Sequence, residues 1–197
     1  MDLLPVVFAS GWASGVNAYA TAFVLGVCGR FIGIPGVPDA LHRNDVLIAL
    51  GVLALIEFVA DKIPYIDSIW DAIGTVIRPI AGATLGALFA GASGDLWTVT
   101  LASVGGLSAL MSHLVKASLR LAINTSPEPA SNIMASAAED ALVTVVAALA
   151  LLAPALAATI ALLLLVLGLA AAWFAWTRIV RGWRAFRRWR ERQRTRG

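Results

Sequence analysis

The stretch from Ala141 to Trp176 contains no charged residue, and one proline, Pro154, lies near its middle. As a single helix this stretch would be about 54 Å long, far more than the roughly 30 Å hydrocarbon core of a bilayer. Proline removes a helical hydrogen bond and clashes with the preceding turn. We therefore expect two membrane spans, about Glu139–Leu152 and Ala155–Thr177, that meet at Pro154. A single kinked, steeply tilted helix is the alternative.

The composition agrees with a protein that folds in lipid. Of the 197 residues, 59% are hydrophobic and 14% are charged, and the mean hydropathy is +0.83. Soluble domains carry about 25% charged residues, so a water-soluble globule and a disordered chain are both excluded. Cys28 is the single cysteine, which excludes an intrachain disulfide. The length favours one compact domain.

Six apolar segments predict an all-α, polytopic membrane helical bundle with about six transmembrane helices in residues 1–177. They are about Val7–Phe31, Val46–Ala60, Ser68–Ala92, Leu96–Ile123 and the two parts of the uncharged stretch. The halves 1–92 and 96–177 would then be two inverted three-helix repeats, as in many transporters. A weak likeness of Ser14–Ala18 to Gly105–Ala109 supports this, although sequences rich in small apolar residues align easily by chance.

Residues 178–197 form a basic tail. It carries nine arginines and one acid, hence +8, whereas the remaining chain has six basic and eleven acidic residues, hence −5. Apolar residues recur every third position, which predicts an amphipathic helix on anionic lipids; nucleic-acid binding is not expected. The residues expected at the lipid surface are Arg181, Trp183, Arg184, Phe186, Arg187, Arg188 and Trp189. The alternative is a topology anchor with no further role.

The positive-inside rule puts this tail in the cytoplasm, directly after the last span. Counting back through six spans, we expect the N-terminus on the cytoplasmic side as well. Arg30 and Arg43 would then face outward, against the rule, but they are two charges against nine. The prediction is a multi-pass protein of a cytoplasmic (inner) membrane with both termini inside.

Charged residues inside or beside the spans are the candidate ion or substrate pathway, because charge at membrane depth is costly and is kept for function. Two acidic pairs at helical spacing, Glu57 with Asp61 and Asp67 with Asp71, need cations or protons nearby. We expect Glu57 to lie deep, and Asp67 and Asp71 to lie at the membrane surface rather than buried. Lys62 and Arg78 are nearby candidate partners.

A second charged set follows on the fourth span, where His113, Lys116 and Arg120 share one helix face. His113 is expected to be the deepest of these. Both sets end on the same membrane side, so they are expected to meet. The functional interpretation is an ion- or proton-coupled site, and the structural one is a ring of salt bridges that fixes helix ends.

Small residues at a spacing of four mark two candidate packing faces. Gly11 with Gly15, and Gly82 with Gly86, let helix backbones approach closely. Asn17 follows the first pair, either as a hydrogen-bonding residue between packed helices or at the break of a discontinuous helix whose free backbone lines a site. Arg78 and the adjacent Pro79 could mark a similar break in the third span.

Four sequence stretches resemble one membrane-protein family. These are Gly11–Tyr19, Glu57–Asp71 with its run Ala-Asp-Lys-Ile-Pro, Arg78–Ala83 and Lys116–Arg120. The family is the one known as domain of unknown function 4126, and the likeness covers nearly everything before the basic tail. The resemblance implies a bacterial inner-membrane protein and implies no reaction.

The sequence therefore favours a small transporter or channel for an ion or small solute, and we expect a homo-oligomer. The alternative is a membrane scaffold or assembly factor whose charges are structural. No nucleophile elbow, zinc-protease motif or phosphate-binding loop occurs, so no enzyme, no cofactor and no metal site are predicted. The two histidines, His42 and His113, lie too far apart in sequence for a Cys/His metal motif.

Overall fold

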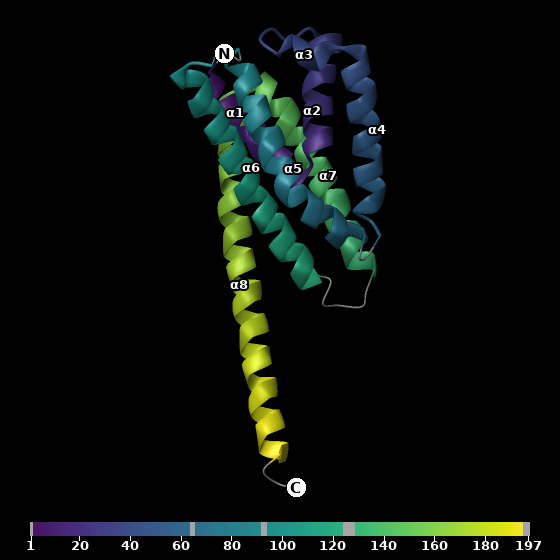
Figure 1. Cartoon of the computed structure of the whole chain (residues 1–197), viewed down its shortest axis with the longest axis vertical. Helices are drawn as coiled ribbons and strands as arrows, with labels where there is room; N and C mark the ends of the chain where they lie inside the picture. The colour runs from purple at the N-terminus through teal and green to yellow at the C-terminus, as the bar shows by residue number, and fades with distance from the viewer. Residues whose placement is uncertain (1, 64–65, 92–93, 124–128, 195–197) are drawn as a thin grey trace.

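The computed structural model describes residues 2–63, 66–91, 94–123 and 129–194, and these contain helices and no strand (Figure 1). The helices run mostly along one direction and form a bundle from which the last helix projects. They are α1 (Leu3–Val16), α2 (Ala18–Val27), the short π-helix η1 (Cys28–Ile32), α3 (Asp39–His42), α4 (Asn44–Ala60), α5 (Ile66–Phe89), α6 (Leu96–Ile123), α7 (Pro129–Leu152) and α8 (Pro154–Arg194).

The uncharged stretch forms two helices, as predicted. α7 ends at Leu152 and α8 begins at Pro154, so a single residue, Ala153, separates them. Proline suits the first position of a helix because its missing N–H would be unsatisfied there anyway. α7 begins at Pro129, well before the expected Glu139, and α8 continues through the tail as one helix of 41 residues. In α5, by contrast, Pro79 lies inside one continuous helix, so the suggested break at Arg78 is absent.

The prediction that the first apolar segment, Val7–Phe31, forms a single span was wrong. Asn17 has an extended backbone (φ −149°, ψ 104°) that separates α1 from α2. The chain turns back there, because the start of α1 and the end of α2 pack in one cluster that contains Val6, Val7, Leu25 and Cys28. α1 and α2 therefore form a hairpin that enters the bundle and leaves at the same end (Figure 1).

This hairpin changes the expected topology. Because α4 to α8 each run along the bundle in alternating directions, the N- and C-termini lie at opposite ends (Figure 1). The prediction that both termini share one side is therefore wrong. Among the described residues, α5, α6, α7 and α8 are long and apolar enough to cross a membrane, and α1 and the segment Ala18–Ile32 are shorter apolar helices. An all-α membrane bundle is confirmed, whereas the exact number of spans and an inverted repeat stay predictions.

Glycines let three helices approach closely at the centre of the bundle. A Cβ on Gly82 would lie 2.5 Å from the carbonyl oxygen of Gly105 in α6, and one on Gly86 would collide with the Leu101 carbonyl. Gly11 and Gly15 of α1 face α6 in the same way, at Gly105 and Ala109. Both predicted small-residue faces thus pack against α6, and α1 and α5 also contact each other directly, for example through Ser14 and the Arg78 carbonyl.

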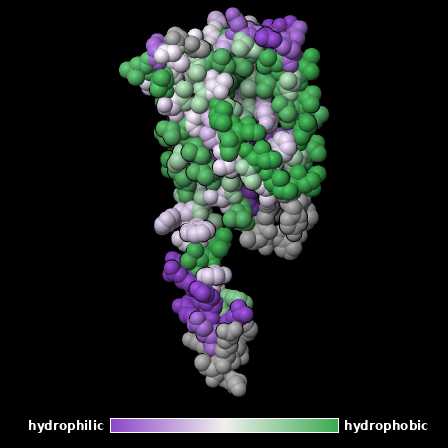
Figure 2. Space-filling model, viewed as in Figure 1, coloured by the Kyte–Doolittle hydropathy of each residue, from purple (hydrophilic) through white to green (hydrophobic). Residues whose placement is uncertain are grey.

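Hydrophobic side chains cover much of the bundle face seen in Figure 2, while hydrophilic ones gather near α3 and along the tail. The tail extends the axis of α8 away from the bundle (Figure 1). The Arg187 guanidinium stacks 4.5 Å from the centre of the Trp183 ring, and Trp183 and Phe186 are exposed. The side chain of Trp189 lies outside the described part of the structure.

Candidate functional site

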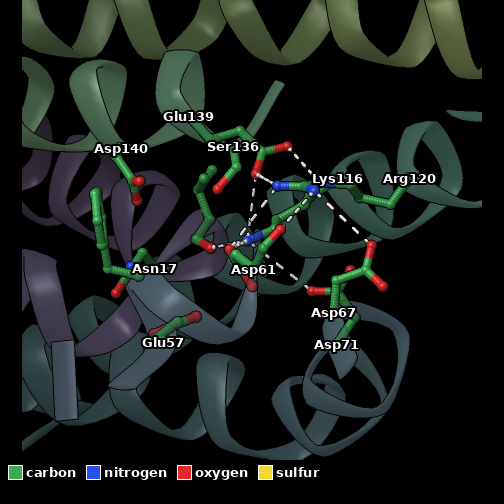
Figure 3. A network of polar contacts seen from close by, with 12 residues as sticks. Asn17, Glu57, Asp61, Asp67, Asp71, Lys116, Arg120, Ser136, Glu139 and Asp140 are labelled. Carbon is green, nitrogen blue, oxygen red and sulfur yellow. Dashed lines mark hydrogen bonds and ion pairs between the residues drawn. The ribbon is translucent and has the colours of Figure 1, made fainter. Parts of the chain in front are cut away.

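The two charged sets predicted from the sequence meet in the bundle interior (Figure 3). α4 ends there and α5 begins there, so both bring acidic residues to the C-terminal half of α6. α6 supplies His113, Lys116 and Arg120, all buried. We call this group the charged cluster; it comprises Glu57, Asp61, Lys62, Asp67, Asp71, Arg78, His113, Lys116, Arg120, Glu139 and Asp140.

Arg78 is the centre of the deep end of the cluster and is 1% exposed. Its Nη2 donates to Glu57 Oε1 at 2.7 Å, and its Nη1 donates to Asp71 Oδ1 at 3.0 Å. Gly74 makes this possible, since a Cβ at that position would lie 2.9 Å from the Arg78 Nε. One guanidinium therefore holds carboxylates from two helices, α4 and α5.

The protonation of His113 follows from its neighbours. Its Nδ1 lies 2.7 Å from Nη1 of Arg78, and a guanidinium can only donate, so Nδ1 accepts. Its Nε2 lies 3.0 Å from the Thr75 hydroxyl, which itself donates to the Asp71 carbonyl. Nε2 therefore carries the proton and donates to Thr75. His113 is neutral here and adds no charge to the cluster.

Lys116 joins the charged cluster to the break between α1 and α2. Its Nζ donates to Asp61 Oδ2 at 2.6 Å and to the carbonyl oxygen of Val16 at 3.1 Å. That carbonyl is free because the helix ends at Val16, where a positive charge is favourable. Asn17 completes the break, as its Oδ1 accepts from the backbone N–H of Ala20 and caps α2. Asn17 thus lies at a break between two helices, but the chain reverses direction there instead of continuing as one discontinuous span.

Arg120 ties α6 to α7 at the outer end of the cluster. Its Nη2 and Nε donate to the two carboxylate oxygens of Glu139, at 2.6 and 3.3 Å. Its Nη1 donates to Asn132 Oδ1 and, at 3.2 Å, to the Asp61 carbonyl oxygen. The same Nη1 lies 3.9 Å from Asp67 Oδ2. At the edge, Lys62 donates to Asp140 at 2.9 Å.

Asp67 and Asp71 are 1% and 6% exposed, so the prediction that they lie at the surface was wrong. Arg120 of α6 and Arg78 of α5 lie close to these two carboxylates and offset the cost of burying their charges. Besides Asp140, which pairs with Lys62, three contributors on α7 were missing from the predicted site, namely Asn132, Ser136 and Glu139. Their spacing of four and three places them on one helix face. That spacing is the signal that would have found them.

Acidic groups outnumber basic ones in the charged cluster. It holds six carboxyl groups and four basic side chains, and neutral His113 leaves 4 − 6 = −2. Two carboxylate oxygens, Glu57 Oε2 and Asp61 Oδ1, are buried without a hydrogen-bond partner. A buried charge normally has partners for all its oxygens. These two oxygens are therefore places where the cluster can take up a proton or a cation.

A cavity of about 130 Å³ adjoins Glu57. Its polar lining comes from Glu57, Arg78 and Tyr19, and its apolar lining includes Trp70, Ile73 and Ile77. Ala18 and Tyr19, the first residues of α2, place this cavity beside the helix break. A liquid water occupies about 30 Å³, so the cavity accepts a few waters or one small solute. No group of three or more His, Cys, Asp or Glu residues arranged to hold a metal ion occurs among the described residues.

The sequence model of one family, described as Domain of unknown function (DUF4126), matches residues 4–174. The chain belongs to this family. The match includes the whole charged cluster and stops before the arginines of the tail. No curated protein and no solved structure matches the chain.

Proposed function

We propose that this DUF4126 protein is a small membrane transporter or channel for an ion or small solute, with the charged cluster as its pathway. The observation that carries the proposal is the excess of two acidic groups, together with two buried carboxylate oxygens that lack partners. A purely structural cluster gains nothing from unmatched buried charge, which is costly in a bilayer.

The depth of the cluster supports this function. Leu121 of α6 lines one groove with Trp173 and Trp176 of α8. Tryptophans mark membrane–water interfaces, and the arginines of the tail follow directly. His113 lies eight residues before Leu121, about 12 Å farther along α6. The charged cluster would thus extend from one membrane surface, the cytoplasmic one by the positive-inside rule, almost to the bilayer midplane.

The helix break supports it as well. Discontinuous helices near the midplane, with free backbone groups and side-chain charges, are typical of transporter binding sites. Glu57 Oε2 and Asp61 Oδ1, which are buried without a partner, are oxygens that can accept a proton, so a proton is a suitable coupling ion.

A flux assay tests this proposal. Purified full-length protein is reconstituted into vesicles of phosphatidylethanolamine and phosphatidylglycerol that contain a pH-sensitive dye, and a potassium diffusion potential drives protons inward. We expect faster acidification than in empty vesicles, and loss of this difference in Glu57→Gln. Asp39→Asn, which removes an exposed carboxylate at the start of α3, is the matched control and retains the flux. Equal rates for wild type, Glu57→Gln and empty vesicles under proton and organic-cation gradients would sink the proposal.

The dense pairing of the cluster favours one alternative, a membrane scaffold. Arg78, Lys116 and Arg120 each contact two or more acidic side chains. A scaffold would lose stability in Glu57→Gln and would show no flux in the wild type, so the same variant separates the two functions when unfolding is also measured.

A further inference from the structure

The cavity beside Glu57 has a lining whose chemistry indicates a class of ligand. The carboxylate of Glu57 is 1% exposed, and its Oε2 has no partner. The residues that line the same cavity include the aromatic Tyr19 and Trp70 and the aliphatic Ile73 and Ile77. A buried acceptor with a negative charge, aromatic faces and aliphatic walls is the combination that recognises organic cations.

From these contacts we infer that the cavity binds a small organic monocation of the alkylammonium class. This rests on the proposed function and names its solute. The positive charge lies at Glu57 Oε2, and the carbon substituents lie against Trp70 and the two isoleucines. Gly74, which also lines the cavity, leaves room for the methyl or methylene groups next to the charge.

Arg78 also lines the cavity, and it does not exclude a cation. Its guanidinium contacts Glu57 Oε1, Asp71 Oδ1 and His113 Nδ1, so two carboxylates already balance its charge. The cluster as a whole still has two more acidic than basic groups. A bound monocation reduces this excess, whereas a bound anion would increase it. The opposite ligand class is therefore disfavoured by the same count of charges.

The geometry also disfavours a metal ion at this place. Sodium, magnesium and calcium need about six oxygen ligands, and the polar side chains in the cavity lining are Glu57, Tyr19 and Arg78. A quaternary ammonium group needs no such shell, because its charge is spread over carbon substituents that aromatic and aliphatic side chains contact directly.

Binding competes with protonation of Glu57. The groups that face this carboxyl are Arg78 from α5, Lys116 from α6, Asp61 from the end of its own helix and Tyr19 from α2. When the cation arrives at a protonated Glu57, the O–H proton leaves to water and the carboxylate pairs with the cation. The cavity thus holds either a proton or the cation, which is the requirement for exchange of one against the other.

The experiment measures binding of choline to the purified full-length protein in detergent by titration calorimetry. The control ligand is 3,3-dimethylbutan-1-ol, which has the same shape with a neutral carbon in place of the nitrogen. We expect saturable choline binding and at least tenfold weaker binding of the alcohol, because the alcohol lacks the positive charge that pairs with Glu57 and with aromatic side chains. A tenfold difference corresponds to about 1.4 kcal/mol. Equal binding of both ligands, or no saturable choline binding, overturns the inference.

Variants locate the site. Glu57→Gln and Trp70→Leu each weaken choline binding at least about tenfold, while Asp39→Asn stays within about twofold. If Glu57→Gln does not fold, the pH dependence of choline binding to the wild type still tests the inference. Its choline affinity must fall as the pH is lowered from 9 to 5, because protons occupy Glu57, and the affinity of the alcohol must not. A choline affinity that is constant over this range overturns the inference.

Failure of this inference and of the proposed function are distinguishable. Choline binding as described, without any flux in vesicles, leaves the site in place and removes the transport function. If flux depends on Glu57 but choline neither binds nor competes, the proposed transport function is supported and the organic-cation site is refuted.

Discussion

At the end of the bundle that carries α3, the interior consists of apolar side chains, among them Val7, Leu25, Leu101 and Leu151. At the other end, between α4, α5, α6 and α7, it consists of the charged cluster (Figure 3). One helix, α6, runs through both regions. Its N-terminal half presents Gly105 to its neighbours, and its C-terminal half presents His113, Lys116 and Arg120.

The two regions resist change for different reasons. In lipid, apolar burial between helices gains little over contact with lipid tails, so close backbone packing holds the apolar region. The packing of the apolar region should not change when a charged side chain elsewhere is neutralised. It should be destabilised when a larger side chain is introduced at one of its close contacts. The charged cluster is held by ion pairs whose members are costly alone. It should tolerate changes of volume better than the loss of one partner.

Arg78→Met is the largest predicted effect. It leaves Glu57 and Asp71 buried without their common partner, and removal of one member of a buried ion pair costs about 3–5 kcal/mol. Unfolding of the purified protein in mixed micelles, followed by helix content, measures this change. Arg43→Met is the control, because Arg43 pairs with Asp45 at 2.6 Å but both side chains are about two-thirds exposed. We expect no measurable change there, and an equal loss in both variants would contradict the assignment of stability to burial.

Lys116→Met, alone and combined with a change at its partner Asp61, tests whether the cost comes from leaving one buried charge unpaired. Alone it should cost about 3 kcal/mol, since Asp61 then stays buried and charged. Combined with Asp61→Leu it should cost less than the single change, because the uncompensated charge is gone. The same unfolding measurement on the two single variants and the double variant gives the coupling energy. A double variant less stable than either single variant would show that the contact of Lys116 with the Val16 carbonyl dominates instead.

Gly86→Ala tests the apolar region. The new Cβ would meet the backbone carbonyl of Leu101, which cannot move without separating α5 from α6. Overpacking of this kind costs about 1–3 kcal/mol. Gly182→Ala is the matched control, because no heavy atom lies within 4 Å of its position, and alanine there favours the helix by up to about 1 kcal/mol. Similar stability changes of the same sign in both variants would refute the packing argument.

The sequence predicted the charged cluster better than the path of the chain. Helical spacing put His113, Lys116 and Arg120 on one face, and the structure brings them to the acids of α4 and α5. The break at Pro154 was predictable because proline acts locally. The hairpin at Asn17 was not, because a change of direction depends on what packs against both arms, and no residue pattern near Asn17 specifies α6 as the partner.

Counting spans by apolar length led to the wrong position of the N-terminus. Val7–Phe31 has the length of a span, yet α1 and α2 each cover only part of the bundle. Burial of Asp67 and Asp71 was missed for a similar reason, since spacing along one helix does not reveal cations that arrive from another. The residues of α7 could have been predicted from the sequence, because the spacing of Asn132, Ser136 and Glu139 places them on one helix face.

Asn17→Ala has the smallest predicted effect and tests the boundary between the two regions. The side chain caps α2 through the Ala20 N–H at 2.9 Å, and loss of such a cap costs about 1 kcal/mol. Asn17→Ser keeps a capping oxygen without adding charge, and should restore most of this stability in the same unfolding assay. Because Lys116 holds the other side of the break through the Val16 carbonyl, the hairpin should persist in both variants. If Asn17→Ala instead destabilises as much as Arg78→Met, the cap and the charged cluster form one unit, and the break belongs energetically to the charged region rather than to the apolar packing of α1 against α6.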